Sequence, residues 1–341
     1  MTTENIEFTT LGTSGIKVSK VCLGTWAIGG WMWGGTDEQE SIETIRTVID
    51  RGIRFVDTAP VYGFGRSEEI VGKALKGHIP RDQVVIATKV GLEWSDSGKV
   101  FRNSTRQRLL KEVDDSLRRL QVDYIDLYQV HWPDPLVPIE ETAQVMAELL
   151  DAGKIRAIGV SNYSPKQMDA FRKAAPLHSI QPPYNLFERQ IEQDILPYAQ
   201  QHDMAVLAYG SICRGLLSGK MSVDTTFDGD DLRKQDPKFQ KPRFSQYLKA
   251  VSRLDDLAKS RHDQRVLELA VRWVLDQGAI ALWGVRRPDQ ADPLEQVFGW
   301  SLSEQDKQEI DAIINSEVSE PVGPEFMAPP SRKEKKGDSP N

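Results

Sequence analysis

The feature that most limits what this chain can fold into is a repeated alternation of short apolar runs with longer amphipathic segments. Short apolar runs are typical of buried strands, and segments in which apolar residues recur every three or four positions are typical of helices. The alternation predicts strands at 21–24, 53–58, 84–89, 125–131, 155–161, 179–181, 205–210 and 279–284. It predicts helices at 37–51, 67–76, 105–120, 139–152, 165–175, 191–202, 264–277 and 288–297.

Successive strand–helix units of this kind favour a closed barrel of parallel strands. The second to seventh expected strands end 20 to 42 residues apart, which leaves room for a loop, a helix and a return. An open nucleotide-binding sheet usually carries a Gly-x-Gly-x-x-Gly turn after its first strand, and none follows residues 21–24. We therefore predict an α/β fold, a single (β/α)8 TIM barrel within residues 1–316.

Three segments lie outside this repeat. Residues 8–18 read as a β-hairpin with a glycine turn, which can close the floor of the barrel. Residues 211–262 are too long for an ordinary connection, so we expect a functional loop after the seventh strand. Residues 317–341 form a C-terminal tail, and its charged end, 331–341, leads us to expect disorder in at least the last ten residues.

Composition narrows the classes of function. The net charge of −7 and the lack of a Lys/Arg stripe argue against nucleic acid as a partner. Two cysteines, Cys22 and Cys213, are too few for a disulfide framework, and residues 1–12 do not resemble a secretory signal. No apolar stretch is long enough to span a membrane, and no His, Cys and carboxylate cluster has metal-ligand spacing. We expect a cytoplasmic protein with no bound metal.

Ionisable side chains stand where three successive predicted strands end. Asp57, Lys89 and His131 occupy these positions, and Tyr62 lies in the loop after the first of them. Because barrel enzymes carry their chemistry at the carboxyl ends of the strands, all four side chains can face one pocket. Asp57 is expected to pair with Lys89, whose charge would lower the pKa of Tyr62 from about 10. Tyr62 could then deliver a proton at neutral pH, and His131 could bond the reacting oxygen.

The three strand-end side chains also have ordinary structural interpretations. Asp57 can be a turn residue, Lys89 a strand-end lysine that reaches solvent, and His131 a core histidine with satisfied hydrogen bonds. A structural origin does not predict that all three would fall at the ends of three successive strands. Their coincidence therefore favours the catalytic interpretation.

Four longer motifs resemble the signature segments of the aldo-keto reductase family, in order and at family-like spacing. They are "DTAPVYGFGRSEEIVGKAL" (57–75), "VVIATKVG" (84–91), "YIDLYQVHWPD" (124–134) and "GKIRAIGVSNYS" (153–164). The resemblance covers roughly residues 8–315. It implies a catalytic tetrad of Asp57, Tyr62, Lys89 and His131, with Tyr62 as general acid, and a nicotinamide cofactor that reduces an aldehyde or ketone. It also accounts for the missing glycine-rich turn, because this family holds the dinucleotide extended across the barrel mouth.

The same resemblance assigns cofactor contacts. Ser161, Asn162 and Gln181 match residues that bind the nicotinamide carboxamide, and Tyr209 matches the aromatic residue that stacks on the nicotinamide ring. The remaining matches are Ser211, Gly215, Leu216, Ser218 and Lys220 near the phosphates, and Gly284, Arg286 and Gln290 near the adenosine. Arg286 favours NADPH, with NADH possible. The chain departs from the family pattern at 211–213 and at Pro293 and Leu294.

The substrate is less constrained. Trp31, Trp33, Trp94 and Trp132 are expected to ring the pocket mouth. Hydrogen bonds from Arg102, Asp134 and Arg214 would favour sugar-derived carbonyls, in keeping with the bacterial, sugar-metabolism branch that the chain resembles. Two alternatives remain: a sugar dehydrogenase working in the oxidative direction, and a non-catalytic subunit that senses the cofactor. The oligomeric state is not predicted.

Overall fold

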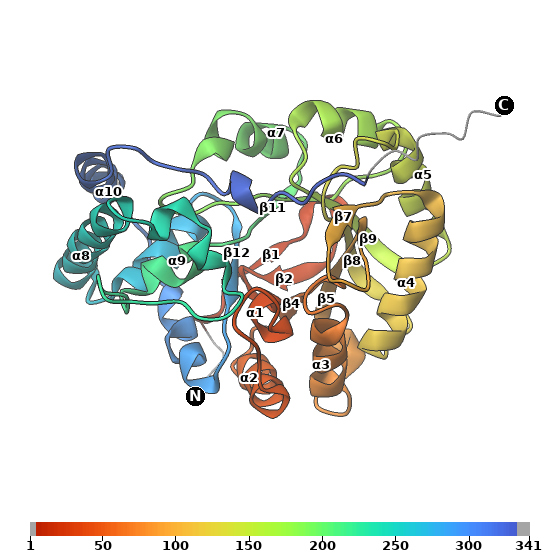
Figure 1. Cartoon of the computed structure of the whole chain (residues 1–341), viewed down its shortest axis with the longest axis horizontal. Helices are drawn as coiled ribbons and strands as arrows, with labels where there is room; N and C mark the ends of the chain where they lie inside the picture. The colour runs from red at the N-terminus through yellow and green to blue at the C-terminus, as the bar shows by residue number, and fades with distance from the viewer. Residues whose placement is uncertain (1–4, 333–341) are drawn as a thin grey trace.

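Eight parallel strands close into a barrel in the computed structural model, which describes residues 5–332 (Figure 1). Each strand pairs with the next in chain order, and the last pairs with the first. The strands are β3 (Val21–Gly24), β4 (Phe55–Asp57), β5 (Val85–Val90), β8 (Ile125–Val130), β9 (Ile155–Ser161), β10 (Ser179–Gln181), β11 (Ala205–Ala208) and β12 (Ile280–Gly284). The predicted (β/α)8 barrel is confirmed.

Helices surround the barrel, and most match the predicted ranges within a few residues (Figure 1). They are α1 (Trp26–Gly29), α2 (Glu38–Asp50), α3 (Arg66–Leu75), α4 (Arg106–Leu120), α5 (Ile139–Asp151), α6 (Pro165–Arg172), α7 (Ile195–Gln201), α8 (Arg243–His262), α9 (Val266–Asp276) and α10 (Glu304–Glu317). The eighth predicted helix is instead a 3-10 helix, η8 (Pro288–Val297). Its interior Pro293 has no N–H to donate to a helical hydrogen bond, which disfavours a regular α-helix there.

The predicted N-terminal hairpin is present as β1 (Phe8–Thr10) paired with β2 (Lys17–Ser19). Its fully buried Leu11 packs with Phe55 and Leu127, which belong to the apolar cluster inside the barrel. Val18 joins the same cluster. The hairpin therefore plugs the barrel floor, and the opposite end is left for a site.

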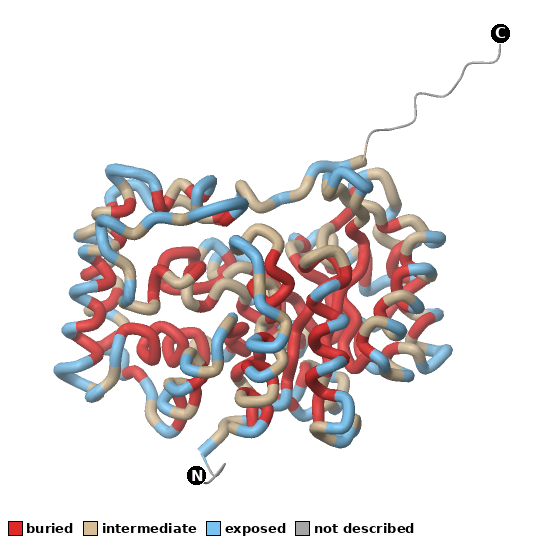
Figure 2. Tube along the Cα trace, turned by 60° about the horizontal axis from the view of Figure 1, so that its bottom comes forward, coloured by how far each residue is buried: buried red, intermediate tan, exposed pale blue. Residues whose placement is uncertain are grey.

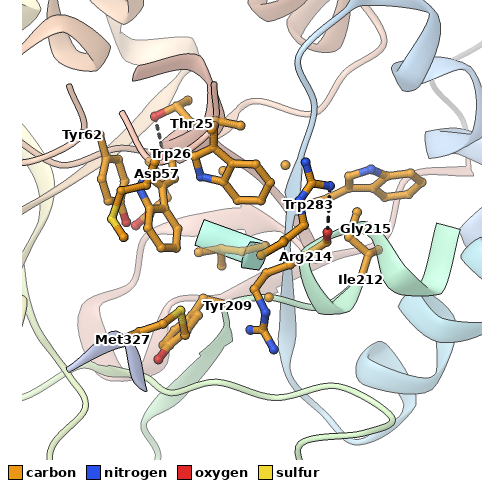
Figure 3. A pocket seen from close by; sticks show the side chains of 18 of the residues that line it. Thr25, Trp26, Asp57, Tyr62, Tyr209, Ile212, Arg214, Gly215, Trp283 and Met327 are labelled. Atoms are coloured by element: carbon orange, nitrogen blue, oxygen red, sulfur yellow. Dashed lines mark hydrogen bonds between the residues drawn. The ribbon is translucent and has the colours of Figure 1, made fainter. Parts of the chain in front are cut away.

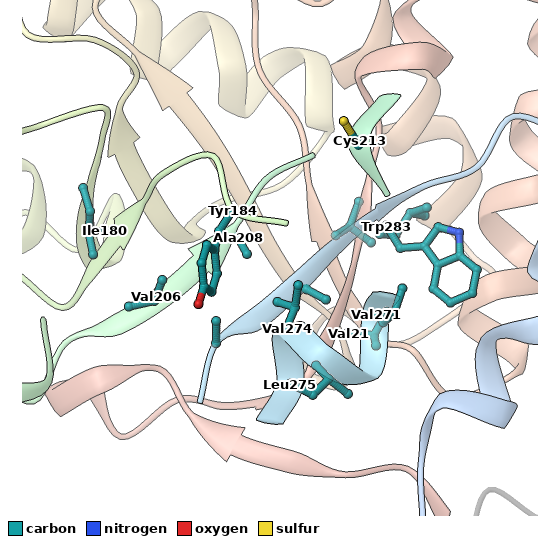
Figure 4. Close-up of a cluster of buried hydrophobic side chains, with 14 of the residues drawn as sticks. Val21, Ile180, Tyr184, Val206, Ala208, Cys213, Val271, Val274, Leu275 and Trp283 are labelled. Atoms are coloured by element: carbon teal, nitrogen blue, oxygen red, sulfur yellow. The ribbon is translucent and has the colours of Figure 1, made fainter. Parts of the chain in front are cut away.

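A second apolar core lies between the strands and the outer helices. Figure 4 shows Val271, Val274 and Leu275 of α9 beside Val206 and Ala208 of β11, and all five are buried. Burial in Figure 2 follows the same pattern, with buried backbone in the interior and exposed backbone on the outer turns. Within residues 5–332 no helix is long and apolar enough to cross a membrane.

Three segments lie over the open end of the barrel. The hairpin β6 (Leu92–Trp94) and β7 (Val100–Arg102) follows β5, and it has no counterpart in the predicted repeat. The long segment after β11 contains loops and short 3-10 turns up to residue 242, and then helix α8. The chain after α10 crosses the molecule to the side of α5 and α6 (Figure 1).

Up to Arg332, the C-terminal segment is bonded to the rest of the protein. Backbone N–H of Arg102 donates to the carbonyl of Pro330 at 3.0 Å, and Arg102 Nε donates to the carbonyl of Pro329 at 2.8 Å. Arg332 pairs with Asp134 at 3.2 Å. The expected disorder at the end of the chain concerns mainly residues 333–341, which lie outside the described residues.

Candidate active site

The four side chains at the strand ends meet at the barrel mouth. Lys89 Nζ donates to Asp57 Oδ1, to the carbonyl of Thr58 at 3.0 Å and to the hydroxyl of Tyr62 at 3.2 Å. The ring of His131 lies edge-on to that of Tyr62, with centroids 5.9 Å apart. Asp57 and Lys89 are almost completely buried. A lysine with an acceptor for each of its three protons is held in one place, directly beside the phenol oxygen.

The electrostatics of this group correct one expectation. Burial raises the pKa of Tyr62 above its ordinary value, and the charge of Lys89 lowers it by less than burial raises it. The predicted net lowering of the Tyr62 pKa is therefore wrong, because the desolvation cost of a buried phenolate was left out. Burial, reinforced by Lys89, holds the pKa of His131 well below its usual range. At neutral pH the site presents a protonated phenol and a neutral imidazole.

A network of amide and hydroxyl groups lies next to the tetrad. Ser161 Oγ donates to the carbonyl of Gln181 at 2.7 Å, and Asn162 Nδ2 donates to Ser161 Oγ at 2.9 Å and to the carbonyl of His131 at 3.1 Å. The hydroxyl of Tyr209 donates to Asn162 Oδ1 at 3.0 Å. Asn162 has a left-handed backbone with φ of 61°, which asparagine tolerates better than most residues. These four predicted residues lie together in one wall.

A cavity of about 610 Å³ extends from this network across the barrel mouth. Figure 3 shows Tyr62 and Asp57 toward one end, Trp283 and Ile212 toward the other, and Tyr209 and Met327 along one side. Most predicted site residues line it: Asp57, Tyr62, His131, Ser161, Asn162, Gln181, Tyr209, Gly215, Ser218, Lys220, Gly284, Arg286, Gln290, Trp31, Trp33 and Trp132. The cavity therefore joins the tetrad to the predicted dinucleotide contacts.

Four predicted residues do not line the cavity. Lys89 lies behind its wall, where it donates hydrogen bonds to Asp57 and Tyr62. Ser211 is fully buried and donates to the carbonyl of Ala208 at 2.9 Å, and Leu216 is a core residue. Trp94 packs against Phe64, with ring centroids 5.6 Å apart. The side chains of Ser211, Leu216 and Trp94 therefore serve packing, because each already has its partners inside the protein.

The end of the cavity lined by Gly215, Ser218, Lys220 and Arg286, where the cofactor phosphates are expected and which we call the phosphate end, is built from loops. The turn η5 (Cys213–Ser218) contains three successive residues with positive φ, which Gly215 adopts without strain. Ser218 Oγ donates to the carbonyl of Gly215 at 2.6 Å, and the exposed Lys220 follows. The backbone N–H groups of Cys213, Gly215 and Leu217 already donate to carbonyls of the same segment, so Lys220 is the cationic group that this turn brings to the cavity.

Arg286 ties this end to the first loop. Its Nη1 donates to the carbonyl of Trp33 at 3.0 Å, and its Nη2 donates to the carbonyl of Gly35 at 2.6 Å. Gln290 Oε1 accepts from the backbone N–H of Arg286 at 2.7 Å. Burial lowers the pKa of Arg286, and the nearby charge of Arg233 lowers it further. The positive charges of Arg286 and Arg233 repel each other beside the cavity. A bound anion would offset this repulsion, so this end of the cavity suits an anionic ligand.

Several lining residues were missed by the sequence reading. Arg233 comes from the long loop, where it pairs with Asp231 and lies over the rings of Trp33 and Phe227. Phe326, Met327, Pro329 and Pro330 come from the segment assigned as a tail. No periodic pattern marks them, because loops carry none. Trp26 lies two residues after β3, in "GTWAIGG", and stacks on Tyr62 with ring centroids 5.8 Å apart. Its position near a strand end was the signal that could have identified it.

The side chains expected to bind sugar hydroxyls are already engaged. Arg214 pairs with Glu188 and Asp236 inside the protein. Arg102 donates to the carbonyls of Pro133 and Pro329. Asp134 accepts from two backbone N–H groups and pairs with Arg332. Near Tyr62 the cavity wall is instead mostly aromatic and apolar, formed by Trp26, Trp31, Val61, Leu92, Val100 and Trp132.

A parallel barrel with a buried Asp–Lys pair beside a tyrosine at its open end has the arrangement expected of a barrel oxidoreductase. Comparison with known proteins agrees. The sequence pattern of the Aldo/keto reductase family matches residues 20–315. Among the residues described, no group of His, Cys, Asp and Glu is arranged to hold a metal ion.

Individual relatives extend over nearly the whole chain. Aldo-keto reductase YhdN of Bacillus subtilis (strain 168) is 62% identical over 331 residues, covering 96% of this chain and 100% of that protein. The NADH-specific methylglyoxal reductase of Escherichia coli (strain K12) is 36% identical over 312 residues, covering 87% and 94%. The solved structure of the glycerol dehydrogenase AKR11B4 from Gluconobacter oxydans is 54% identical with a TM-score of 0.85, covering 96% and 100%.

The chain belongs to the aldo/keto reductase family. It is an oxidoreductase that acts on small-molecule carbonyl compounds with a nicotinamide cofactor, NAD(P)H.

Proposed function

We propose that this enzyme reduces small aldehydes or ketones with Tyr62 as the general acid and with a preference for NADPH. The observation that carries the proposal is the bonded group of Asp57, Lys89 and Tyr62 at the end of the cavity. The nicotinamide cofactor supplies the hydride when it is bound. His131, held neutral, donates an N–H to the carbonyl oxygen, and Tyr62 gives that oxygen its proton. Lys89 remains beside the phenolate and stabilises it.

The residues present fit a dinucleotide with an additional phosphate. Amide groups of Asn162 and Gln181 line the cavity near the tetrad, where a carboxamide can bond to them. Arg233, Arg286 and Lys220 line the far end. This arginine pair supports NADPH, since a guanidinium matches a phosphate in shape and charge. The NADH-specific relative shows that the family also accommodates the other cofactor.

For the substrate, the mostly apolar wall near Tyr62 favours a small carbonyl compound. The names of the relatives, a methylglyoxal reductase and a glycerol dehydrogenase, support a short oxygen-bearing substrate. The second of these names also favours oxidation of a small alcohol as a second function, because the chemistry is reversible. A cytoplasmic location remains part of this proposal.

The test is the substitution Tyr62→Phe, which removes the phenol oxygen and little else. We expect reduction of a small aldehyde to fall by about a thousandfold, within the range for loss of a general acid. NADPH binding, followed by fluorescence, should persist, because the ring remains. Assays of short aldehydes, ketones and alcohols in both directions, with both cofactors, would identify the preferred reaction. Near-normal turnover by Tyr62→Phe would refute the assignment of the acid.

A further inference from the structure

Gln129 is a buried amide inside the barrel, and the chemistry proposed above does not use it. It lies in β8 and is fully buried. In strand register it is level with Lys89 of β5 on one side and Gly159 of β9 on the other. The interior layer below it is apolar, with Phe55, Ala87, Leu127 and Ala157. An amide in such a place is stable only if its polar atoms are hydrogen-bonded.

Gln129, Gln181 and Asp57 are joined in a closed ring of three hydrogen bonds. Gln129 Nε2 donates to Asp57 Oδ2 at 3.0 Å, and Gln181 Nε2 donates to the same oxygen at 2.9 Å. Gln181 Nε2 also donates to Gln129 Oε1 at 3.1 Å. A carboxylate only accepts, so both amide nitrogens must face Asp57. The orientation of both amides is thereby determined by the chemistry of the carboxylate.

The ring gives the two oxygens of Asp57 different partners. Oδ1 accepts from Lys89, and Oδ2 accepts from the two amides. A carboxylate bonded on one oxygen only can rotate about its Cβ–Cγ bond. With both oxygens bonded, Asp57 has one orientation, and the position of Lys89 Nζ beside the Tyr62 hydroxyl is correspondingly defined.

The ring also leaves one acceptor for the cavity. Gln181 is a wall residue, and its Oε1 has no hydrogen-bond partner within residues 5–332. Because Gln129 accepts one proton of the Gln181 amide and Asp57 the other, this oxygen stays available to an N–H donor in the cavity.

Gly159 makes room for this arrangement. A Cβ atom at Gly159 would lie 3.0 Å from Gln129 Cγ and 2.4 Å from Ser179 Oγ, closer than packed side chains tolerate. The absence of a side chain on β9 therefore allows the longer Gln129 side chain to reach Asp57 across the barrel interior.

We propose that Gln129 is a positioning residue, which fixes the orientation of Asp57 and Gln181 and through them the site of proton transfer and carboxamide binding. The inference rests on the proposed role of Tyr62, since Asp57 acts on that tyrosine through Lys89. Gln129 itself touches neither substrate nor cofactor.

The test compares Gln129→Leu and Gln129→Glu with the unchanged enzyme. In Gln129→Leu we expect single-turnover reduction by bound NADPH to slow by about tenfold to a hundredfold, because a small misplacement of a reacting group can lower the rate by up to about a hundredfold. The dissociation constant of NADPH, measured without substrate by fluorescence, should rise by about threefold or less, because Gln181 keeps its bond to Asp57. Thermal unfolding reports whether each variant is folded.

Gln129→Glu has the same size and gives a pH signature that a purely structural role would not produce. Its carboxyl group can donate to Asp57 Oδ2 only when protonated, and burial beside another carboxylate raises its pKa. The rate should therefore approach that of the unchanged enzyme near pH 5.5 and fall by about tenfold by pH 8.5, as the two carboxylates come to repel each other. If Gln129→Leu does not fold, this variant alone provides the test.

Tyr128→Phe is the matched control. Tyr128 is the adjacent buried residue of β8, and its hydroxyl has no hydrogen-bond partner among the described residues, so its loss should leave the rate unchanged. The proposal is overturned if Gln129→Leu reacts within about twofold of the unchanged enzyme, if Gln129→Glu shows no recovery at low pH, or if Tyr128→Phe is slowed equally. The role of Tyr62 is tested separately, by Tyr62→Phe alone. A failure of that assignment can therefore be distinguished from a failure of the role proposed for Gln129.

Discussion

The two ends of the cavity are built in different ways. At the end proposed for hydride transfer, here called the hydride-transfer end, Asp57, Lys89 and Gln129 are carried by neighbouring strands, and Lys89 and Gln129 both bond Asp57 deep in the barrel. At the phosphate end, Arg233 and Arg286 are carried by loops, and Arg286 bonds mainly to backbone carbonyls. The strand register determines the first arrangement before any ligand arrives. The second depends on how the loops pack against one another.

Hydrogen bonds between the long loop after β11 and the first loop stabilise the phosphate end. Asp230 of the long loop accepts from the backbone N–H groups of Met32 at 2.8 Å and Gly34 at 3.0 Å. The backbone N–H of Leu232 donates to the carbonyl of Met32 at 2.9 Å. These bonds are at the surface and join segments about 200 residues apart. Changes here should alter cofactor affinity, whereas changes at the other end should alter chemistry and stability.

The largest expected effect is at the hydride-transfer end. Lys89→Met removes the partner of buried Asp57, and an unpaired buried charge costs about 3–5 kcal/mol of unfolding free energy. Chemical denaturation would measure this loss. Reduction should also fall by about a thousandfold, because no cation then stabilises the phenolate of Tyr62.

Lys238→Met is the matched control, because it removes the cation of a buried ion pair outside the tetrad. Lys238 pairs with Glu188 at 2.7 Å. It should lower stability while the rate of hydride transfer in folded, cofactor-saturated enzyme changes far less. A stable and fully active Lys89→Met enzyme would remove the distinction drawn between the two ends.

The next effect is at the phosphate end. Arg286→Ala should raise the dissociation constant of NADPH by about tenfold to a hundredfold. This is the range expected for the loss of a charge-assisted hydrogen bond to a phosphate. The affinity for NADH should fall by about threefold or less, because NADH binding loses only the support that Arg286 gives to the first loop. Titrations of both cofactors by fluorescence would show the difference.

Asp230→Ala separates these two causes. It breaks the bonds between the loops and keeps the arginines, so it should weaken NADPH and NADH to the same extent. If Arg286→Ala also affected both cofactors equally, the argument for NADPH would be lost.

The smallest effect is that of pH on the intact enzyme. Reduction needs the protonated phenol, and the raised pKa of Tyr62 keeps this form present beyond the ordinary phenol value of about 10. The lowered pKa of His131 keeps its imidazole neutral well below about pH 6.5. The rate of hydride transfer in reduction should therefore vary by less than about threefold between pH 6 and 9.

Oxidation of the alcohol needs the phenolate, so its rate should rise with pH over the same range. Stopped-flow measurements in both directions would test this pair of profiles. A reduction rate that declines from pH 7 upward would contradict the raised pKa of Tyr62.

Much of the hydride-transfer end could be predicted from the sequence. Asp57, Lys89 and His131 stand at the ends of apolar runs, and in a parallel barrel such ends meet at one rim. Gln129 stands two residues before His131 inside an apolar run, and it was overlooked because its partners come from two other strands. Position along a strand is visible in a sequence, but the partner across a barrel is not.

The loops were less predictable. The chain from Pro324 to Pro330 has no periodic pattern, yet it supplies part of the cavity wall through bonds to Arg102. Trp94 was expected at the pocket from its loop position and Leu216 from its family-like position, but both face packed neighbours instead of the cavity. A loop side chain takes its direction from the segments it packs against, which lie elsewhere in the sequence.

The sequence by itself determined the barrel and the kinds of side chain at its rim, because the alternation of apolar and amphipathic segments is a local property. It also identified the family through motifs that remain contiguous in the chain. The tertiary structure alone decided the sign of the Tyr62 pKa shift, the bonding of Asp57 by Gln129 and Gln181, and the closure of the cavity by the C-terminal segment. These depend on burial and on contacts between distant segments, which exist only once the chain has folded.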